Sequence, residues 1–309
     1  MLKLAPYCCS AIWGGTRLHC EYGFESAEPQ IAEAWLLSCH PNGPSIIKEG
    51  IYAGKTLQEY IEIKGRCVLG NLGVIFQEFP ILIKLIDAAD DLSIQVHPSN
   101  LYALEHAGGE YGKTEMWYIL DAQPGAYIYL GVEHSMTRED FERSIENNLL
   151  QTELRKQPVK KGEHYYIPPG TIHGIGKGVL IAEIQQNSDI TYRIYDYNRR
   201  DKHGKKRELH LAQAKDVAIL EPTQMQYEFG SHLVRCTYFT VDERVGVQHA
   251  DCDFDSFTSL LFLEGEGTLC NAEGSMKVTK GDSVFLDAGS GDYHVYGNCR
   301  YLCTRIGII

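Results

Sequence analysis

The sequence predicts a mainly β protein with two β-barrel domains and a few peripheral helices. Most of the 309 residues fall into short runs of β-branched and aromatic side chains, separated by turns rich in Gly, Pro, Asn and Asp. A unit of strand, turn and strand at residues 116–130 is repeated faintly at residues 259–269. Helical periodicity is confined to a few segments. These observations together favour two similar β domains.

The expected strands share a high content of β-branched and aromatic residues, and turn residues bound each of them. They lie at residues 80–87, 92–97, 115–121, 126–131, 164–167 and 179–186. Because side chains alternate along a strand, each of these segments presents one set of residues to the interior.

Helices are expected at residues 56–64, 99–107, 137–157 and 208–218. Thr56 and Glu59 form a capping box that begins the first of these helices. In the third, apolar residues that include Phe141 and Ile145 recur at helical spacing, and Pro158 follows. The pattern therefore predicts one continuous helix over residues 137–157.

Residues 162–173 contain the most informative motif of the chain. Gly162, Pro168, Gly170 and His173 have the spacing G-x5-P-x-G-x2-H, which describes a strand, a tight turn and a second strand. Pro168 presets its own φ, and Gly170 tolerates a φ that most residues avoid. The turn therefore determines the direction of the His173 imidazole.

Three further residues are expected to meet His173. Gln95 and His97 are two apart in an apolar run, so both side chains leave the same face of a strand. Glu115 begins another expected strand. An amide, two imidazoles and a carboxylate that converge inside a β-barrel form a cage for a divalent metal ion.

The chain is long enough for two domains of ordinary size, and residues 221–223 suit a boundary. Residues 1–221 are expected to form the catalytic, metal-binding domain with its helical segments. In residues 222–309 the repeated motif has Asp287 in place of the proline and lacks the histidine after Gly289. The second domain is therefore predicted to be a degenerate copy without metal ligands.

Composition and charge exclude several classes of protein. A formal net charge of −12 argues against a nucleic-acid partner, which would require a basic face. The basic run at residues 202–207 is interpreted as a solvated loop or, alternatively, as the rim of an anion site. The chain contains no run of about 18 apolar residues, so no membrane span is predicted. Ten scattered cysteines without a C-x-x-C motif, and no secretory signal pattern, indicate a cytoplasmic protein.

Several motifs resemble known families. Residues 162–173 are similar to the second motif of the cupin superfamily, which implies two cupin-type (jelly-roll) β-barrel domains, the second degenerate. Other segments resemble type I phosphomannose isomerases in that family's order: residues 12–15, 31–35, 84–98, 112–118 and 189–199. Between residues 131 and 161 there is room for one helix where longer members carry a helical insertion. The resemblance is therefore to the short bacterial form.

This resemblance implies a metal-dependent isomerase that interconverts mannose 6-phosphate and fructose 6-phosphate through a cis-enediol. It implies Gln95, His97, Glu115 and His173 as the ligands of one metal ion, typically Zn2+. Mn2+ or Fe2+ suits the same mixed nitrogen and oxygen ligands. The expected partner is a small sugar phosphate, and the oligomeric state stays open.

Four charged residues at motif positions are expected to bind the substrate. Lys84 and Lys113 are assigned to its hydroxyl or phosphate groups. Arg193 is planar and permanently charged, and it is assigned as a catalytic residue that stabilises the enediolate or holds the phosphate. Arg199 is a further candidate for the phosphate.

The proton shuttle between C1 and C2 is assigned to a carboxylate. Glu183 lies on the strand after His173, and burial would raise its pKa towards neutrality. Asp189 is the second choice for this role and is alternatively expected to assist opening of the pyranose ring.

Three other functions stay open from the sequence alone. The first is a cupin isomerase of another sugar phosphate, such as glucose 6-phosphate, which differs in one hydroxyl at C2. The second is a sugar-binding regulatory cupin without turnover. The third is a dioxygenase, although such enzymes more often use a two- or three-histidine iron site in which a glutamine ligand is unexpected.

Overall fold

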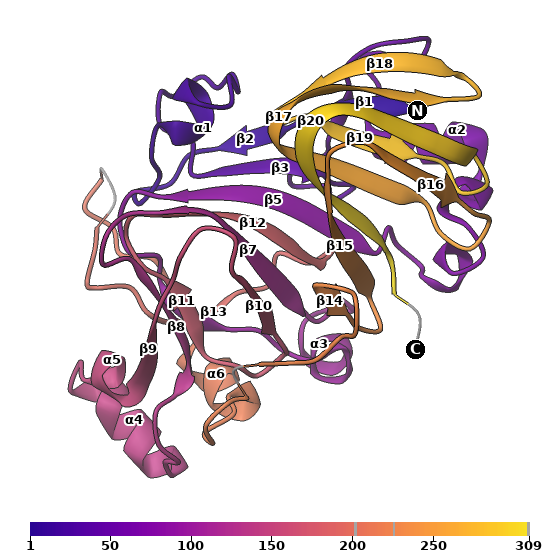
Figure 1. Cartoon of the computed structure of the whole chain (residues 1–309). Coiled ribbons are helices and arrows are strands. Elements are labelled where there is room, and N and C mark those ends of the chain that lie inside the picture. The colour runs from indigo at the N-terminus through magenta and orange to yellow at the C-terminus, as the bar shows by residue number, and fades with distance from the viewer. Residues whose placement is uncertain (201–202, 225, 308–309) are drawn as a thin grey trace.

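The computed structural model describes residues 1–200, 203–224 and 226–307 and has three antiparallel sheets within them (Figure 1). Two of the sheets pack face to face and contain the segments on which the metal site was predicted. The third contains most of the C-terminal part of the chain. The prediction of a mainly β fold with a few helices is confirmed.

The two facing sheets are built from residues between Tyr7 and Tyr195. In the described residues the first has six strands in the order β10 (His164–Ile167), β7 (Glu115–Ala122), β12 (Val179–Gln186), β5 (Ile81–Ala88), β3 (Glu33–Leu37) and β2 (Tyr7–Cys9). The second has five, in the order β13 (Tyr192–Tyr195), β6 (Ile94–Val96), β11 (His173–Ile175), β8 (Tyr127–Val132) and β9 (Leu154–Pro158). Buried side chains such as Trp117 and Ile181 from the first sheet share one core cluster with Ile128 and Ile175 from the second. Because each sheet buries one apolar face against the other, the pair forms a sandwich.

The third sheet is formed mainly by C-terminal strands. Within the described part of the chain its main path is β14 (Val234–Arg235), β15 (Phe239–Val245), β20 (Gly291–Ile306), β17 (Thr258–Asn271), β19 (Ser283–Leu286), β1 (Leu2–Ala5) and β4 (Ile46–Ile47). β16 (Gln248–Cys252) and β18 (Gly274–Thr279) pair with β20 and β17. Leu2 of β1 lies opposite Phe285 of β19. The division into residues 1–221 and 222–309 stays a prediction, and this sheet takes strands from both sides of it.

The helices are short and lie outside the sandwich core. They are α1 (Arg17–Cys20), α2 (Leu57–Lys64), α3 (Asn100–His106), α4 (Arg138–Glu146), α5 (Leu150–Glu153) and α6 (Leu211–Val217), with 3-10 turns η1 (Arg66–Leu69) and η2 (Gly73–Ile75). The predicted capping box begins α2: Thr56 Oγ1 accepts from the Glu59 N–H at 3.0 Å, and Glu59 Oε2 accepts from the Thr56 N–H at 2.7 Å. In Figure 1, α4, α5 and α6 lie at the end of the molecule away from the C-terminal sheet. None of the described helices is long and apolar enough to cross a membrane.

The prediction of one helix over residues 137–157 is wrong beyond Glu146. Asn148 has a φ of 57°, in the left-handed region, and this interrupts the helix before the short α5. Residues 154–158 instead form β9, which pairs with β8. Leu150 and Leu154 are buried in one cluster with Phe141, so the apolar spacing that suggested a helix is satisfied by a helix, a turn and a strand.

Candidate functional site

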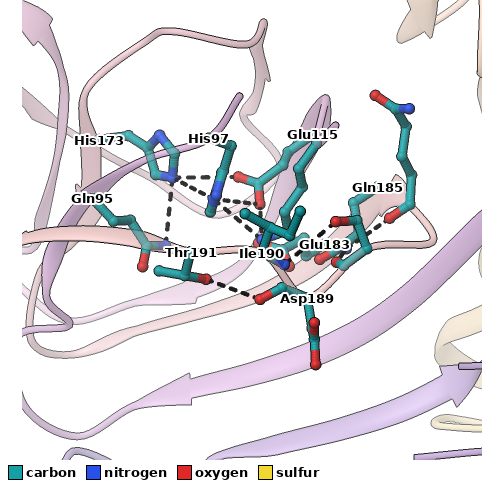
Figure 2. A network of polar contacts seen from close by, with 12 residues as sticks. Gln95, His97, Glu115, His173, Glu183, Gln185, Asp189, Ile190 and Thr191 are labelled. Carbon is teal, nitrogen blue, oxygen red and sulfur yellow. Dashed lines mark hydrogen bonds and ion pairs between the residues drawn. The ribbon is translucent and has the colours of Figure 1, made fainter. Parts of the chain in front are cut away.

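Three side chains of the metal-ligand type meet between the two facing sheets. His97 follows β6, Glu115 begins β7 and His173 begins β11, and all three are buried. Their ligand atoms lie within 4.8 Å of one another. Nε2 of His97 is 3.2 Å from Nε2 of His173 and 3.2 Å from Oε1 of Glu115 (Figure 2). Segments far apart in the sequence therefore form one compact cluster.

The turn before His173 joins the two histidine segments. Gly170 has a φ of +85°, and its N–H donates to the carbonyl oxygen of His97 at 2.9 Å. The carbonyl oxygen of Thr171 lies 2.8 Å from Nδ1 of His173. A proton on Nδ1 satisfies this contact and leaves Nε2, which faces the cluster, free to bind a metal. The glycine and proline pattern therefore orients this imidazole as the motif predicts.

Gln95 lies at the edge of the same cluster. It is directly opposite His173 in the pairing of β6 with β11, and its Nε2 is 3.4 Å from Nε2 of His173. A half-turn of the Gln95 amide exchanges its oxygen and nitrogen at little cost, since the two atoms are nearly equivalent in shape. The amide oxygen then faces the cluster. All four predicted ligands are thus neighbours.

The protonation states at the cluster suit a divalent cation. Burial, followed by the charge of Lys113, lowers the pKa of His97 to about 3. Burial alone would raise the pKa of Glu115, but Lys113 and His97 outweigh it and hold this pKa well below its usual range. Metal ligands must be neutral imidazoles and ionised carboxylates. These residues therefore carry the charges that metal binding needs.

The carboxylate of Glu115 is also short of hydrogen-bond donors. Within the described residues both of its oxygens are buried without a hydrogen bond, and Nδ1 of His97 has none either. The ammonium of Lys113 forms an ion pair with Glu115 and lies 3.2 Å from Nε2 of His97. One ammonium does not occupy all the lone pairs of this buried carboxylate, and two imidazoles face the same point, so the donor set fits a metal ion.

A small cavity of about 100 Å³ opens beside the cluster. Its lining combines charged and apolar side chains from both sheets and from the segments after β13. It is lined by Trp13, Glu33, Lys84, Ile86, Leu92, Ser93, Gln95, Lys113, Ile175, Glu183, Thr191, Arg193 and Arg207. Two lysines, two arginines and two glutamates in so small a space indicate a site for a polar, anionic molecule.

Glu183 is the buried carboxyl of this cavity. Its Oε2 accepts a hydrogen bond from Nε1 of Trp117 at 2.8 Å, and its Oε1 lies 3.7 Å from Nζ of Lys84. Burial, followed by the negative charge of Glu115, raises the pKa of Glu183 to about 7, against the opposing charges of Lys113 and Lys84. A carboxyl group with such a pKa can both accept and release a proton near neutral pH.

Two lysines and an arginine accompany this carboxyl. Nζ of Lys84 lies 3.3 Å from Oε2 of Glu33, and the neighbouring carboxylates raise the pKa of Lys84 although burial opposes them. Arg193 lies opposite Gln95 in the pairing of β13 with β6. Its guanidinium donates to Oγ of Ser93 at 3.3 Å and to a backbone oxygen at 2.9 Å.

Asp189 and Arg199 do not line the cavity. Oδ2 of Asp189 accepts a hydrogen bond from Nδ2 of Asn42 at 2.6 Å, and its Oδ1 is 3.7 Å from Nε2 of His40. Figure 2 shows the Asp189 carboxylate directed away from the two cluster histidines. Arg199 donates to Asp196 at 2.5 Å and covers the ring of Tyr197. Both residues therefore make structural contacts with neighbouring segments.

Four polar residues that line the cavity were not among the predicted site residues. They are Glu33, Ser93, Thr191 and Arg207. The first three lie inside segments that resemble the family. The sequence therefore indicated these segments, but not these particular side chains. Arg207 ends the basic run, for which the rim of an anion site was the alternative interpretation.

Two family models match the chain. The model described as phosphomannose isomerase type I, catalytic domain, matches residues 1–120. The model described as mannose-6-phosphate isomerase, cupin domain, matches residues 230–306. The second match supports the predicted cupin class for the C-terminal sheet.

Curated relatives and solved structures agree with these models. Mannose-6-phosphate isomerase ManA of Bacillus subtilis is 39% identical over 99% of this chain and 98% of that protein. A mannose-6-phosphate isomerase of Streptococcus mutans is 47% identical over 68% of this chain and 65% of that protein. The crystal structure of the mannose 6-phosphate isomerase from Bacillus subtilis superimposes with a TM-score of 0.89 at 36% identity, and covers 98% of each chain. The similarity therefore extends over both sandwich and C-terminal sheet.

Proposed function

The chain belongs to the mannose-6-phosphate isomerase family, and we propose that it interconverts mannose 6-phosphate and fructose 6-phosphate. The observation that carries this proposal is the meeting of His97, Glu115 and His173 beside a charged cavity. Aldose–ketose isomerisation moves a proton between C1 and C2, so it needs a group that exchanges protons and positive charge near the sugar oxygens. The cavity contains both.

We assign the metal ion to Gln95, His97, Glu115 and His173. Zn2+ is the first candidate, since two imidazoles and one carboxylate are a common catalytic zinc set. When bound, the ion would polarise the substrate carbonyl and stabilise negative charge on the enediolate. The buried Glu115 oxygens without hydrogen bonds support this assignment, and so does the contact of His173 Nδ1 with Thr171, which leaves Nε2 unprotonated towards the cluster.

Glu183 is our choice for the proton shuttle. The N–H of Trp117 holds Oε2, so Oε1 is the atom that takes the proton from one carbon and returns it to the other. Its pKa near 7 makes both directions accessible at neutral pH. Asp189 is the weaker choice, because Asn42 already occupies its carboxylate outside the cavity.

The cationic side chains orient the substrate. Lys84 and Lys113 line the cavity together with Glu183 and are assigned to sugar hydroxyl groups. Arg193 is assigned to the developing enediolate oxygen, because a guanidinium donates paired hydrogen bonds and stays charged. Arg199 is not assigned to the substrate here, since its guanidinium is engaged with Asp196 and Tyr197. A cytoplasmic location stays part of the proposal, and ten free cysteines agree with it.

A coupled assay on the purified full-length protein tests this function. We expect turnover of mannose 6-phosphate, no comparable turnover of glucose 6-phosphate, and about one divalent ion per chain by elemental analysis. A chelator should remove metal and turnover together, and added Zn2+, Mn2+ or Fe2+ should restore both. Full turnover by the metal-free protein, or a preference for glucose 6-phosphate, would contradict the proposal.

A further inference from the structure

A buried carboxylate, Asp196, binds two arginines beside the site. Its side chain is only 6% exposed. Oδ2 accepts from Nε of Arg207 at 2.8 Å, and Oδ1 accepts from a terminal nitrogen of Arg207 at 2.5 Å. The same Oδ1 accepts from Arg199 at 2.5 Å. The contact with Arg207 is a two-point fork, which fixes the plane of that guanidinium.

The two arginines have different surroundings. Arg199 donates to the backbone oxygen of Asp91 and stacks on Tyr197, so it ties loops together. Arg207 lines the site cavity with Arg193, and both also line an adjoining outer cavity with Glu208. Its side chain is 29% exposed. Arg207 therefore stands where the site meets solvent.

Positive charge accumulates at this mouth although the whole chain has a formal charge of −12. Arg199 and Arg207 both donate to the buried carboxylate of Asp196, and Arg193 lies close enough to feel the charges of Asp196 and of both arginines. Burial, followed by the charge of Arg207, lowers the pKa of Arg193, and Asp196 compensates only partly. Cations that repel one another in a half-buried space bind an added anion favourably.

We infer that Arg207 binds the phosphate group of the substrate and that Asp196 is the positioning residue that holds its guanidinium at the mouth of the cavity. This inference rests on the proposed function. Arg193 lies opposite Gln95, so a sugar with its reacting carbons at the ligand cluster extends past Arg193 towards Arg207. Asp196 occupies Nε and one terminal nitrogen of Arg207, which leaves the other terminal nitrogen for a phosphate oxygen.

Four variants of the full-length, metal-loaded protein test the inference. R207Q removes the positive charge of Arg207, and R207K keeps a positive charge but cannot form the two-point contact with Asp196. D196N removes the negative charge that holds the Arg207 guanidinium. R143Q is the matched control, since Arg143 is 69% exposed on α4 and pairs only with Asp140 among its described contacts. The readouts are kcat and KM for mannose 6-phosphate, the inhibition constant of inorganic phosphate, and the rise in Tm that phosphate produces.

R207Q should raise KM and the phosphate inhibition constant by on the order of tenfold or more, because a charge-assisted hydrogen bond contributes about that much to affinity. The change in kcat should be smaller. D196N should act in the same direction, R207K should fall between R207Q and wild type, and R143Q should match wild type. Because Asp196 acts through Arg207, the double variant R207Q/D196N should be no weaker than R207Q in phosphate binding.

Unchanged KM and phosphate inhibition in R207Q would overturn the inference, and so would additive effects in the double variant. The Tm readout separates this failure from failure of the proposed function. If wild type does not turn over mannose 6-phosphate but phosphate still raises its Tm, and R207Q loses that rise, the anion site stands and only the function fails. If phosphate raises the Tm of wild type and R207Q equally, Arg207 does not bind phosphate.

Discussion

Neighbours that do no chemistry themselves determine the properties of the reactive side chains. The indole of Trp117 holds one oxygen of Glu183, and the carbonyl of Thr171 selects the ring nitrogen of His173 that faces the cluster. The contact between Trp117 and Glu183 is not part of any sequence motif, whereas the contact between Thr171 and His173 lies inside the motif at residues 162–173. The first depends on the pairing of β12 with β7, which puts Trp117 beside Glu183 in one sheet, and the second is local to the turn before β11.

Glu183→Gln should lower kcat by about 10²- to 10⁴-fold, the usual contribution of a general acid–base group, and leave metal content unchanged. The amide keeps the shape of the side chain but cannot exchange a proton. Steady-state kinetics and elemental analysis check this. Asp189→Asn is the control and should retain most of kcat, because that carboxylate lies outside the cavity. The reverse ranking of the two variants would assign the shuttle to Asp189.

The raised pKa of Glu183 predicts the pH at which activity is lost. A base must be ionised to accept a proton, and ionisation of this carboxyl is completed only above its pKa of about 7. We therefore expect kcat/KM for mannose 6-phosphate to fall as the pH drops through about 7 rather than near the ordinary value of 4.5. A value of kcat/KM that stays constant from pH 8 to pH 5 would show that Glu183 is ionised throughout this range and that its pKa is not raised in the active protein.

Asp196→Ala should lower kcat/KM without loss of metal, because it releases Arg207 at the cavity and, among the described contacts of Asp196, touches no residue of the ligand cluster. It should also lower the free energy of unfolding more at neutral than at acid pH. Burial raises the pKa of Asp196, but hydrogen bonds from Arg207 and Arg199 outweigh it and hold this pKa below its usual range. A lowered carboxyl pKa contributes stability that is present above about pH 4 and lost as the pH falls through the folded pKa. The difference in the free energy of unfolding between wild type and variant, measured in urea, should therefore be largest at pH 7 and shrink as the pH falls below about 4.

At the scale of elements, the turn between β10 and β11 connects fold and site. Gly170 takes a φ of +85°, and a Cβ at this position would lie 2.8 Å from the backbone oxygen of Val217. The same glycine donates to the carbonyl of His97. Gly170 thus contacts both the end of α6 and the histidine that we assign to the metal ion.

Gly170→Ala should destabilise the protein by about 1–3 kcal/mol and weaken metal binding, because strain and crowding must move the turn. Gly162→Ala is a matched control: its φ is +89°, but no atom lies within 4 Å of the added Cβ. Alanine at position 162 therefore introduces the same kind of backbone strain but no steric clash. Urea unfolding and metal titration check both variants, and an equal loss of metal affinity in the two would remove the proposed link between turn and site.

At the scale of the whole molecule, one core joins the sandwich to the C-terminal sheet. Phe285 of β19 is fully buried and stacks with Phe257, and both share a cluster with Leu4, Phe79 and many residues of β3 and β5. β1 completes the C-terminal sheet. The two parts are therefore expected to unfold together.

Phe285→Leu should lower the free energy of unfolding by about 1–3 kcal/mol, as for a shape change in a packed core. All three tryptophans lie before residue 120, so their fluorescence reports on the sandwich rather than on the altered strand. We expect its midpoint in urea to shift with the midpoint measured by circular dichroism. Phe254→Leu, at a position that is 73% exposed, is the control. A fluorescence midpoint that does not move would show independent domains.

The sequence alone predicted the β class and the capped helices, because these depend on short-range rules: alternation along a strand, caps, and a turn that only glycine and proline permit. The four neighbouring residues of metal-ligand type were implied by the resemblance to a known family together with the motif at residues 162–173. The tertiary structure decided that residues 154–158 form a strand, that β1 joins the C-terminal sheet, and that Arg207 rather than Arg199 faces the cavity. An apolar run can bury itself as helix or strand, and a long charged side chain turns towards whichever partner lies nearest in space. Those outcomes depend on contacts between distant segments, which spacing along the chain does not specify.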